Sequence, residues 1–145
     1  MITSMETNDI IIIADSSALI SLSIVTDYNH NTAKKILENI FDEGHTIIIP
    51  AEIFSESVNI LRKKFGHKKA YESVELFLES ALFIVTPTSD MSRKEGLNKF
   101  KNIFSGVSYT DCLVMAVADY HSTKFVFGFD EIFKKNGYTL PIKNH

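Results

Sequence analysis

The sequence lacks the features of an exported or membrane protein. Its single cysteine, Cys112, cannot form a disulfide within the chain and lies in an apolar run, which is typical of a buried, inert thiol. No apolar run approaches the roughly 20 residues of a membrane span. Residues 1–9 are polar and have neither the basic start nor the apolar stretch of a signal peptide. These absences predict a cytoplasmic protein with no membrane segment.

Common nucleotide-binding signatures are missing as well. The sequence has no GxxxxGK[ST] phosphate-binding loop and no glycine fingerprint for dinucleotides. Its net charge of −3 argues against non-specific binding of polyanions over the whole surface. This charge does not exclude nucleic acid, provided that acidic side chains gather in one site and a cation neutralises them.

The composition and the order of apolar patterns predict the fold. With 145 residues, 45% hydrophobic and 23% charged, the chain is expected to form a single domain over residues 1–145, with residues 1–9 as a disordered or N-terminal extension. Continuous apolar runs predict strands at 10–14, 46–49, 82–85 and 124–127, with a candidate fifth at 138–140. Helical patterns fall after residue 16 and at 30–42, 51–65, 70–81, 89–102 and 112–118. Alternating strands and helices predict an α/β fold, a three-layer α/β/α sandwich with a mainly parallel central sheet.

Acidic residues recur next to these elements. Asp15 and Asp130 each follow a strand, Glu56 lies at the border of the apolar face of a helix, and Asp111 begins a buried helix. Each has an alternative structural interpretation. Asp15 and Asp130 are common turn or cap residues, Glu56 can pair with a nearby lysine, and Ser108-x-x-Asp111 matches a capping box.

The combination of acids favours a metal site. Carboxylates gathered at one end of a sheet repel one another and stay ionised together only if a cation neutralises them. Oxygen ligands suit Mg²⁺ or Mn²⁺ rather than zinc. A divalent ion held in this way can activate water and stabilise the leaving oxygen of a phosphodiester. The pattern therefore predicts metal-dependent phosphoryl chemistry.

The acidic motifs also resemble those of a known family. The segments are Ile13-Ala14-Asp15-Ser16-Ser17, Ile53-Phe54-Ser55-Glu56, Ser108-x-x-Asp111-Cys112 and Phe127-Gly128-Phe129-Asp130-x-x-Phe133. In this order they are similar to the motifs of PIN-domain ribonucleases, and most of all to VapC-type toxins of toxin–antitoxin pairs. The resemblance spans residues 10–138.

This resemblance implies an activity and a set of site residues. The implied activity is Mg²⁺- or Mn²⁺-dependent endoribonuclease cleavage that leaves a 5′-phosphate and a 3′-hydroxyl. Asp15 and Asp111 would be direct metal ligands, Glu56 a ligand or an orienter of the attacking water, and Asp130 a ligand of a second ion or of its water shell. The hydroxyls of Ser16, Ser17 and Ser108 would support the site. RNA, an antitoxin protein and a second copy of the chain are the implied partners.

One position departs from the family pattern. The residue two before the last acid is usually threonine or serine, and here it is Gly128. The departure removes a hydroxyl near Asp130 and makes the role of Asp130 the least secure of the four.

Other residues are candidates for secondary roles. A basic run is a candidate for gripping RNA phosphates, although cations at a helix C-terminus also favour the helix dipole. It comprises Arg62, Lys63, Lys64, Lys68 and Lys69. Phe104, Tyr109 and Phe129 are candidates for stacking on bases, and Asp119 is a further candidate ligand.

Two alternative functions stay open from the sequence. One is a catalytically silent PIN-like module that binds RNA or a protein. The other is a receiver-like phosphotransfer domain, which also groups acids around Mg²⁺ at strand ends. A receiver usually has a phospho-acceptor after its third strand, whereas residues 82–85 are followed here by Thr86-Pro87.

Overall fold

A parallel sheet of four strands forms the centre of the computed structural model, which describes residues 10–103 and 106–142. The strands are β1 (Ile11–Ala14), β2 (Thr46–Pro50), β3 (Phe83–Thr86) and β4 (Val126–Phe127), in the order β3-β2-β1-β4. All three strand pairs are parallel. The carboxyl ends of the strands therefore meet at one edge of the sheet. The expected extension at residues 1–9 and the stacking candidate Phe104 lie outside the described residues.

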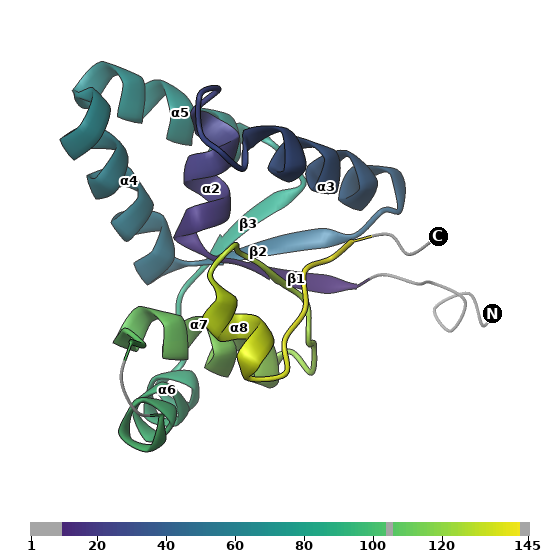
Figure 1. Cartoon of the computed structure of the whole chain (residues 1–145), viewed down its shortest axis with the longest axis vertical. Helices are drawn as coiled ribbons and strands as arrows, with labels where there is room; N and C mark the ends of the chain where they lie inside the picture. Colours follow the sequence, from purple (N-terminus) through teal and green to yellow (C-terminus); the bar gives the residue numbers. More distant parts are fainter. Residues whose placement is uncertain (1–9, 104–105, 143–145) are drawn as a thin grey trace.

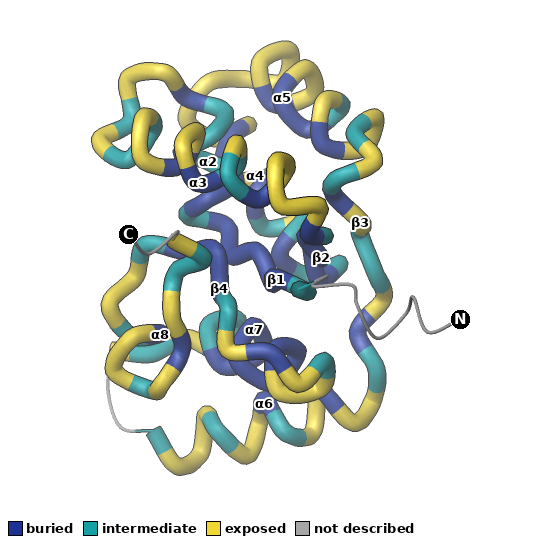
Figure 2. Tube along the Cα trace, turned by 90° about the vertical axis from the view of Figure 1, so that its right-hand side faces the viewer, coloured by how far each residue is buried: buried dark blue, intermediate teal, exposed yellow. Residues whose placement is uncertain are grey.

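Helices cover both faces of this sheet. Figure 1 shows α2 (Ser16–Ser23), α3 (His30–Asp42), α4 (Ala51–Phe65) and α5 (His67–Glu79) on one side. On the other side lie α6 (Asp90–Asn102), α7 (Tyr109–Tyr120) and α8 (Glu131–Lys135), and the turned view of Figure 2 keeps the same division. The predicted three-layer α/β/α sandwich is confirmed.

The core lies where the central strands meet the helices. Ile12, Ile13 and Ala14 of β1 have no exposed surface, as expected for a strand covered on both faces. Helix α7 is buried from Cys112 to Ala118, and Figure 2 shows this helix and the central strands as the dark interior of the molecule. Cys112 is the buried thiol that the sequence predicts, and its burial raises the pKa of the thiol.

Helix α6 forms despite the glycine in its middle. The Ser89 hydroxyl accepts a hydrogen bond from the Ser92 N–H at 3.1 Å and caps its first turn. Gly96 is buried and faces Leu113 of α7, where a Cβ on Gly96 would lie 3.4 Å from the Leu113 Cα. The small residue lets the two helices approach closely.

The predicted fifth strand at 138–140 does not form. Thr139 makes only an isolated parallel bridge to Phe125, and β4 is shorter than the predicted strand at 124–127. The Tyr138 hydroxyl instead donates to Asp119 Oδ1 at 2.7 Å. Two backbone hydrogen bonds, from the Val126 N–H to the Thr139 carbonyl and from the Thr139 N–H to the Lys124 carbonyl, form this bridge, and the pairing does not extend beyond it. In the described parts of the chain, no helix combines the length and the apolar character needed to cross a membrane.

The core predicts the effect of a truncation in β1. Ile13→Ala should lower the free energy of unfolding by about 2–5 kcal/mol, because Ile13 is fully buried and the removed atoms leave a cavity. Val25 is 75% exposed, and Val25→Ala should change stability by less than about 0.5 kcal/mol. Urea unfolding of both variants measures the difference. Equal losses would contradict this account of the core.

Candidate metal centre

The sheet topology brings the predicted acids to one edge. Asp15 follows β1 and Asp130 follows β4, its parallel neighbour. Glu56 lies on α4, which begins directly after β2 on the other side of β1. Asp111 is in the first turn of α7. This is the edge at which open α/β sheets bind ligands.

Asp15 is buried and held by Ser17. Only 5% of its surface is exposed, and its Oδ2 accepts from the Ser17 hydroxyl at 2.8 Å and from the Ser17 N–H at 3.3 Å. The Ser17 hydroxyl in turn accepts from the Phe129 N–H at 2.9 Å. Asp15 therefore caps α2 and is also tied, through Ser17, to the loop that follows β4. The supporting role predicted for Ser17 has a geometric basis.

The surroundings of Asp15 disfavour its charge. Burial is the largest cause and raises the pKa of Asp15 from 3.8 to about 6, against the opposing effect of the Ser17 hydrogen bonds. The negative charge of Asp111 raises this pKa further. Asp111 is thus close enough to Asp15 to repel it electrostatically. A cation between them would relieve both the burial cost and the repulsion.

Glu56 contributes a carboxylate oxygen with no partner. The Ser16 hydroxyl donates to Glu56 Oε1 at 3.4 Å, which joins α4 to the residue after Asp15. Glu56 Oε2 is buried and accepts no hydrogen bond from any described residue. A buried, unsatisfied carboxylate oxygen is costly unless a donor or a cation reaches it. The ion pair with a nearby lysine that the sequence allowed is not seen among the described residues.

Asp111 and Asp130 both act as helix caps. Asp111 Oδ2 accepts from the Ser108 N–H at 3.1 Å, and the Ser108 hydroxyl accepts from the Asp111 N–H at 3.1 Å, so the predicted capping box is present. Asp130 is exposed, and its Oδ1 accepts from the Ile132 N–H at 3.1 Å. A capping carboxylate keeps a second oxygen for other contacts, so these caps do not conflict with metal binding.

The acids share one edge of the sheet but do not form a closed site. In residues 10–103 and 106–142, no three His, Cys, Asp or Glu side chains stand close enough together to hold a metal ion. The donor set nevertheless fits Mg²⁺ or Mn²⁺, because it consists of carboxylate oxygens, one of them buried and without a partner. Asp15, Glu56 and Asp111 are the residues that would hold the ion, with Asp130 farther towards solvent.

Asp119 has a structural role instead. Lys99 Nζ lies 2.9 Å from Asp119 Oδ2, and the Tyr138 hydroxyl donates to Asp119 Oδ1. Both carboxylate oxygens are thus engaged by partners that link α6, α7 and the C-terminal segment. Burial and the bond to Asp119 raise the pKa of Tyr138. Sequence spacing could not show these partners, because they come from separate elements.

The basic run lies at the corner between α4 and α5. All five of its cationic residues, Arg62, Lys63, Lys64, Lys68 and Lys69, are exposed. Figure 1 shows that this corner is the end of α4 farthest from β2, whereas Glu56 is near the beginning of the helix. The run therefore does not line the acidic edge. Any contact with a substrate bound at the acids would involve a more distant part of that substrate.

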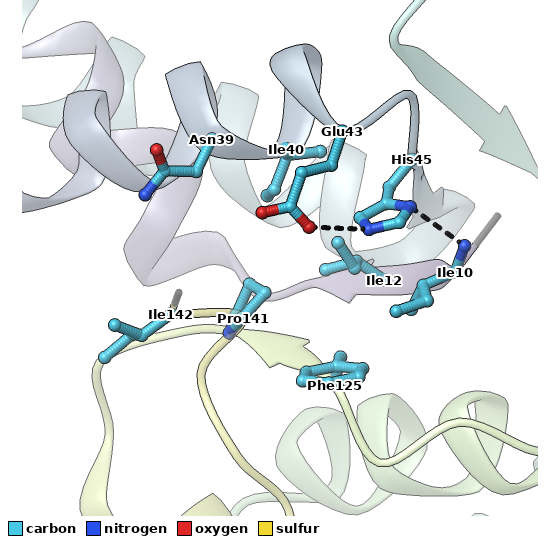
Figure 3. A pocket seen from close by; sticks show the side chains of 9 residues that line it. All are labelled: Ile10, Ile12, Asn39, Ile40, Glu43, His45, Phe125, Pro141 and Ile142. Carbon is cyan, nitrogen blue, oxygen red and sulfur yellow. Dashed lines mark hydrogen bonds and ion pairs between the residues drawn. The ribbon is translucent and has the colours of Figure 1, made fainter. Parts of the chain in front are cut away.

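A small apolar pocket lies at the opposite edge of the sheet (Figure 3). It has a volume of about 60 Å³, and its lining includes Ile10, Ile12, His45 and Phe125. The Ile10 N–H donates to His45 Nδ1 at 3.1 Å, and His45 Nε2 lies 3.1 Å from Glu43 Oε2. None of the predicted acids lines this pocket. It is separate from the candidate metal centre.

The fold and its acidic edge define an α/β/α sandwich with a candidate metal centre. The family model for the PIN domain matches residues 12–137. The chain therefore belongs to the PIN domain family. No curated protein sequence matches it.

Two solved structures show the same fold. The toxin VapC20 of Mycobacterium tuberculosis, described as cleaving the sarcin–ricin loop, is 18% identical with a TM-score of 0.78, over 88% of this chain and 96% of that one. VapBC2 of Rickettsia felis, bound to a DNA fragment from its promoter, is 14% identical with a TM-score of 0.69, over 90% of this chain and 97% of that one. These neighbours confirm the predicted resemblance at the level of the fold.

The raised pKa of Asp15 predicts that Asp15→Asn increases the stability of the fold in a pH-dependent way. The pKa of Asp15 is about 6 in the folded chain and 3.8 in the unfolded chain, so the wild type loses stability as pH rises between these values. Asn retains the cap but has no charge to bury. In metal-free buffer, Asp15→Asn should therefore be more stable than the wild type by up to roughly 3 kcal/mol above about pH 7.

Below about pH 3 the two proteins should have similar stability, because Asp15 is then protonated in both the folded and the unfolded state, whose pKa is 3.8. Chemical denaturation across this pH range, with EDTA present, measures the difference. An Asn variant that is less stable than the wild type at neutral pH would contradict the burial of an ionisable Asp15.

Proposed function

We propose that this protein is a metal-dependent endoribonuclease. The observations that carry the proposal are the buried Asp15 carboxylate, whose pKa is raised mainly by burial, and a buried Glu56 oxygen without a partner among the described residues, on the side chain that Ser16 joins to this strand end. Membership of the PIN domain family supports it. Such a group of acids is costly in a protein that never binds a cation.

Each acid has a proposed role. Asp15 and Asp111 bind Mg²⁺ or Mn²⁺ directly, and Glu56 binds the ion or orients the attacking water. Asp130, the most exposed of the four, serves a second ion or its water shell. When bound, the ion supplies a Lewis acid for the scissile phosphate and lowers the pKa of a bound water. Ser17 fixes the orientation of Asp15, Ser16 that of Glu56, and Ser108 that of Asp111.

We further propose that the protein is the toxin of a toxin–antitoxin pair. Both structural neighbours support this, since one is described as a toxin that cleaves an RNA loop and the other as VapBC2 on promoter DNA. The proposed partners are an RNA substrate, an antitoxin protein and a second copy of the chain. The proposed location is the cytoplasm.

A catalytically silent PIN-like module is the second candidate. The observation that favours it is the open arrangement of the acids. Among the described residues, no three His, Cys, Asp or Glu side chains lie close enough together to hold a metal ion. The same two structures and the PIN match exclude the receiver-like alternative at the level of the fold.

RNA cleavage tests the choice between the two candidates. With Mg²⁺ or Mn²⁺ the wild type should cut single-stranded or loop RNA, and EDTA should abolish the cutting. Asp15→Asn and Asp111→Asn should each reduce the rate by about a hundredfold or more, because the cation loses a direct ligand. Asp42→Asn, at the exposed end of α3, is the matched control. Cleavage by both Asn variants at the wild-type rate would contradict the proposal.

The basic run predicts a separate effect on RNA affinity. Replacing Lys63 and Lys64 with Gln should raise KM and leave kcat unchanged. The slope of the logarithm of RNA affinity against the logarithm of salt concentration should become shallower by about one unit for each phosphate that is no longer neutralised. Lys34 and Lys35 are also exposed, on α3, and replacing them with Gln is the control. A fluorescence titration at several salt concentrations measures the effect. Identical salt slopes for both double variants would remove the basic run from the RNA-binding surface.

A further inference from the structure

Gly128 lies directly against Asp15. It is the first residue after β4 and is buried. A Cβ built on Gly128 would lie 2.8 Å from the Asp15 Cβ and 3.3 Å from Asp15 Oδ2. It would also lie 3.1 Å from Cε2 of Phe133. The absence of a side chain at this position is what allows the Asp15 carboxylate to occupy its present place.

The clash could not be relieved by a small adjustment. The Asp15 Cβ is one bond from its backbone, and the Asp15 N–H donates to the Phe127 carbonyl at 2.9 Å. Ala14 and Phe127 are paired across β1 and β4, so both sides of the contact are held by the sheet. Gly128 is not among the glycines with positive φ. Its requirement is therefore steric and not conformational.

The hydrogen bonds around Asp15 depend on the same approach. Ser17 donates to Asp15 Oδ2 and accepts from the Phe129 N–H, so its hydroxyl spans the gap between the two strand ends. A side chain at position 128 that pushes the strand ends apart lengthens this bridge. The carboxylate would then lose both its position and the donor that orients it.

We infer that Gly128 is a positioning residue. Because it has no side chain, the Asp15 side chain can lie directly against its backbone, in the position from which Asp15 binds a cation. The inference rests on the proposed function for its consequence, but its geometry can be tested without a metal. The threonine or serine usual in the family would not fit here: at the spacing that these two strand ends have in this chain, a side chain at position 128 displaces the carboxylate and weakens the site. In the sequence, Gly128 stands out because it removes a hydroxyl near Asp130. In this structure, the same glycine is required for the position of the Asp15 side chain.

Gly128→Ala is the test, and Gly96→Ala is its matched control. Gly96 is also buried and has no positive φ, but its added Cβ would meet Leu113 only at 3.4 Å, in ordinary contact. The first measurement is the rise in melting temperature that Mn²⁺ produces. Gly128→Ala should need at least about tenfold more Mn²⁺ for the same rise, because a small misplacement of a reacting group is costly. Gly96→Ala should match the wild type.

The second measurement uses the metal-free protein. The NMR amide signal of Ser17, whose N–H donates to Asp15 Oδ2, reports the position of the carboxylate, and it should shift in Gly128→Ala but not in Gly96→Ala. An unchanged signal, or an unchanged Mn²⁺ requirement, would overturn the inference. A wild type whose melting temperature does not respond to Mn²⁺ would contradict the proposed function, and the amide signal would still decide whether Gly128 positions Asp15.

A double variant separates Asp15 from Phe133. Gly128→Ala/Phe133→Leu removes the ring that the new methyl group also meets and protects the experiment if Gly128→Ala alone does not fold. The double variant should fold and still show the weakened Mn²⁺ response and the shifted Ser17 amide signal, because the contact with Asp15 persists. Full recovery of the wild-type Mn²⁺ response would assign the effect to Phe133 and overturn the inference.

Discussion

The burial of an ionisable Asp15 at the end of a central parallel strand is the constraint on which the site depends. The sheet places β1 between β2 and β4, so this carboxylate follows a strand that is paired on both sides. Ser17 and Gly128 hold it from two sides. Its cost to the folded chain, visible in the raised pKa, is the kind of cost that a bound cation removes. Stability and function therefore oppose each other at this residue.

Much of the fold could be predicted because its strongest patterns are local. Helices α3 and α4 begin and end where their apolar stripes, Pro50 and Gly66 place them. The central strands are continuous apolar runs, which identifies them as covered on both faces. The candidate strand at 138–140 is reduced to a single parallel bridge between Thr139 and Phe125. A three-residue pattern cannot show how far strand pairing extends.

The position of the candidate acids at one edge of the sheet could be predicted, whereas their contacts could not. The acids follow strand ends or begin helices, and a parallel sheet gathers such positions at one edge. The Ser17 bridge to Phe129 joins residues 112 apart in the chain, and the contact between Gly128 and Asp15 depends on strand register. The lone Glu56 oxygen likewise follows from packing between α2 and α4. No local pattern carries that information.

A calorimetric titration of Mn²⁺ into the metal-free protein at about pH 7.5 tests the central claim most directly, because it measures the cation that the acids are proposed to hold. The account predicts saturable binding by the wild type, at a stoichiometry of one or two ions, that is lost in Asp15→Asn although the variant is folded. Absence of binding by the wild type, or equal binding by the variant, would contradict it.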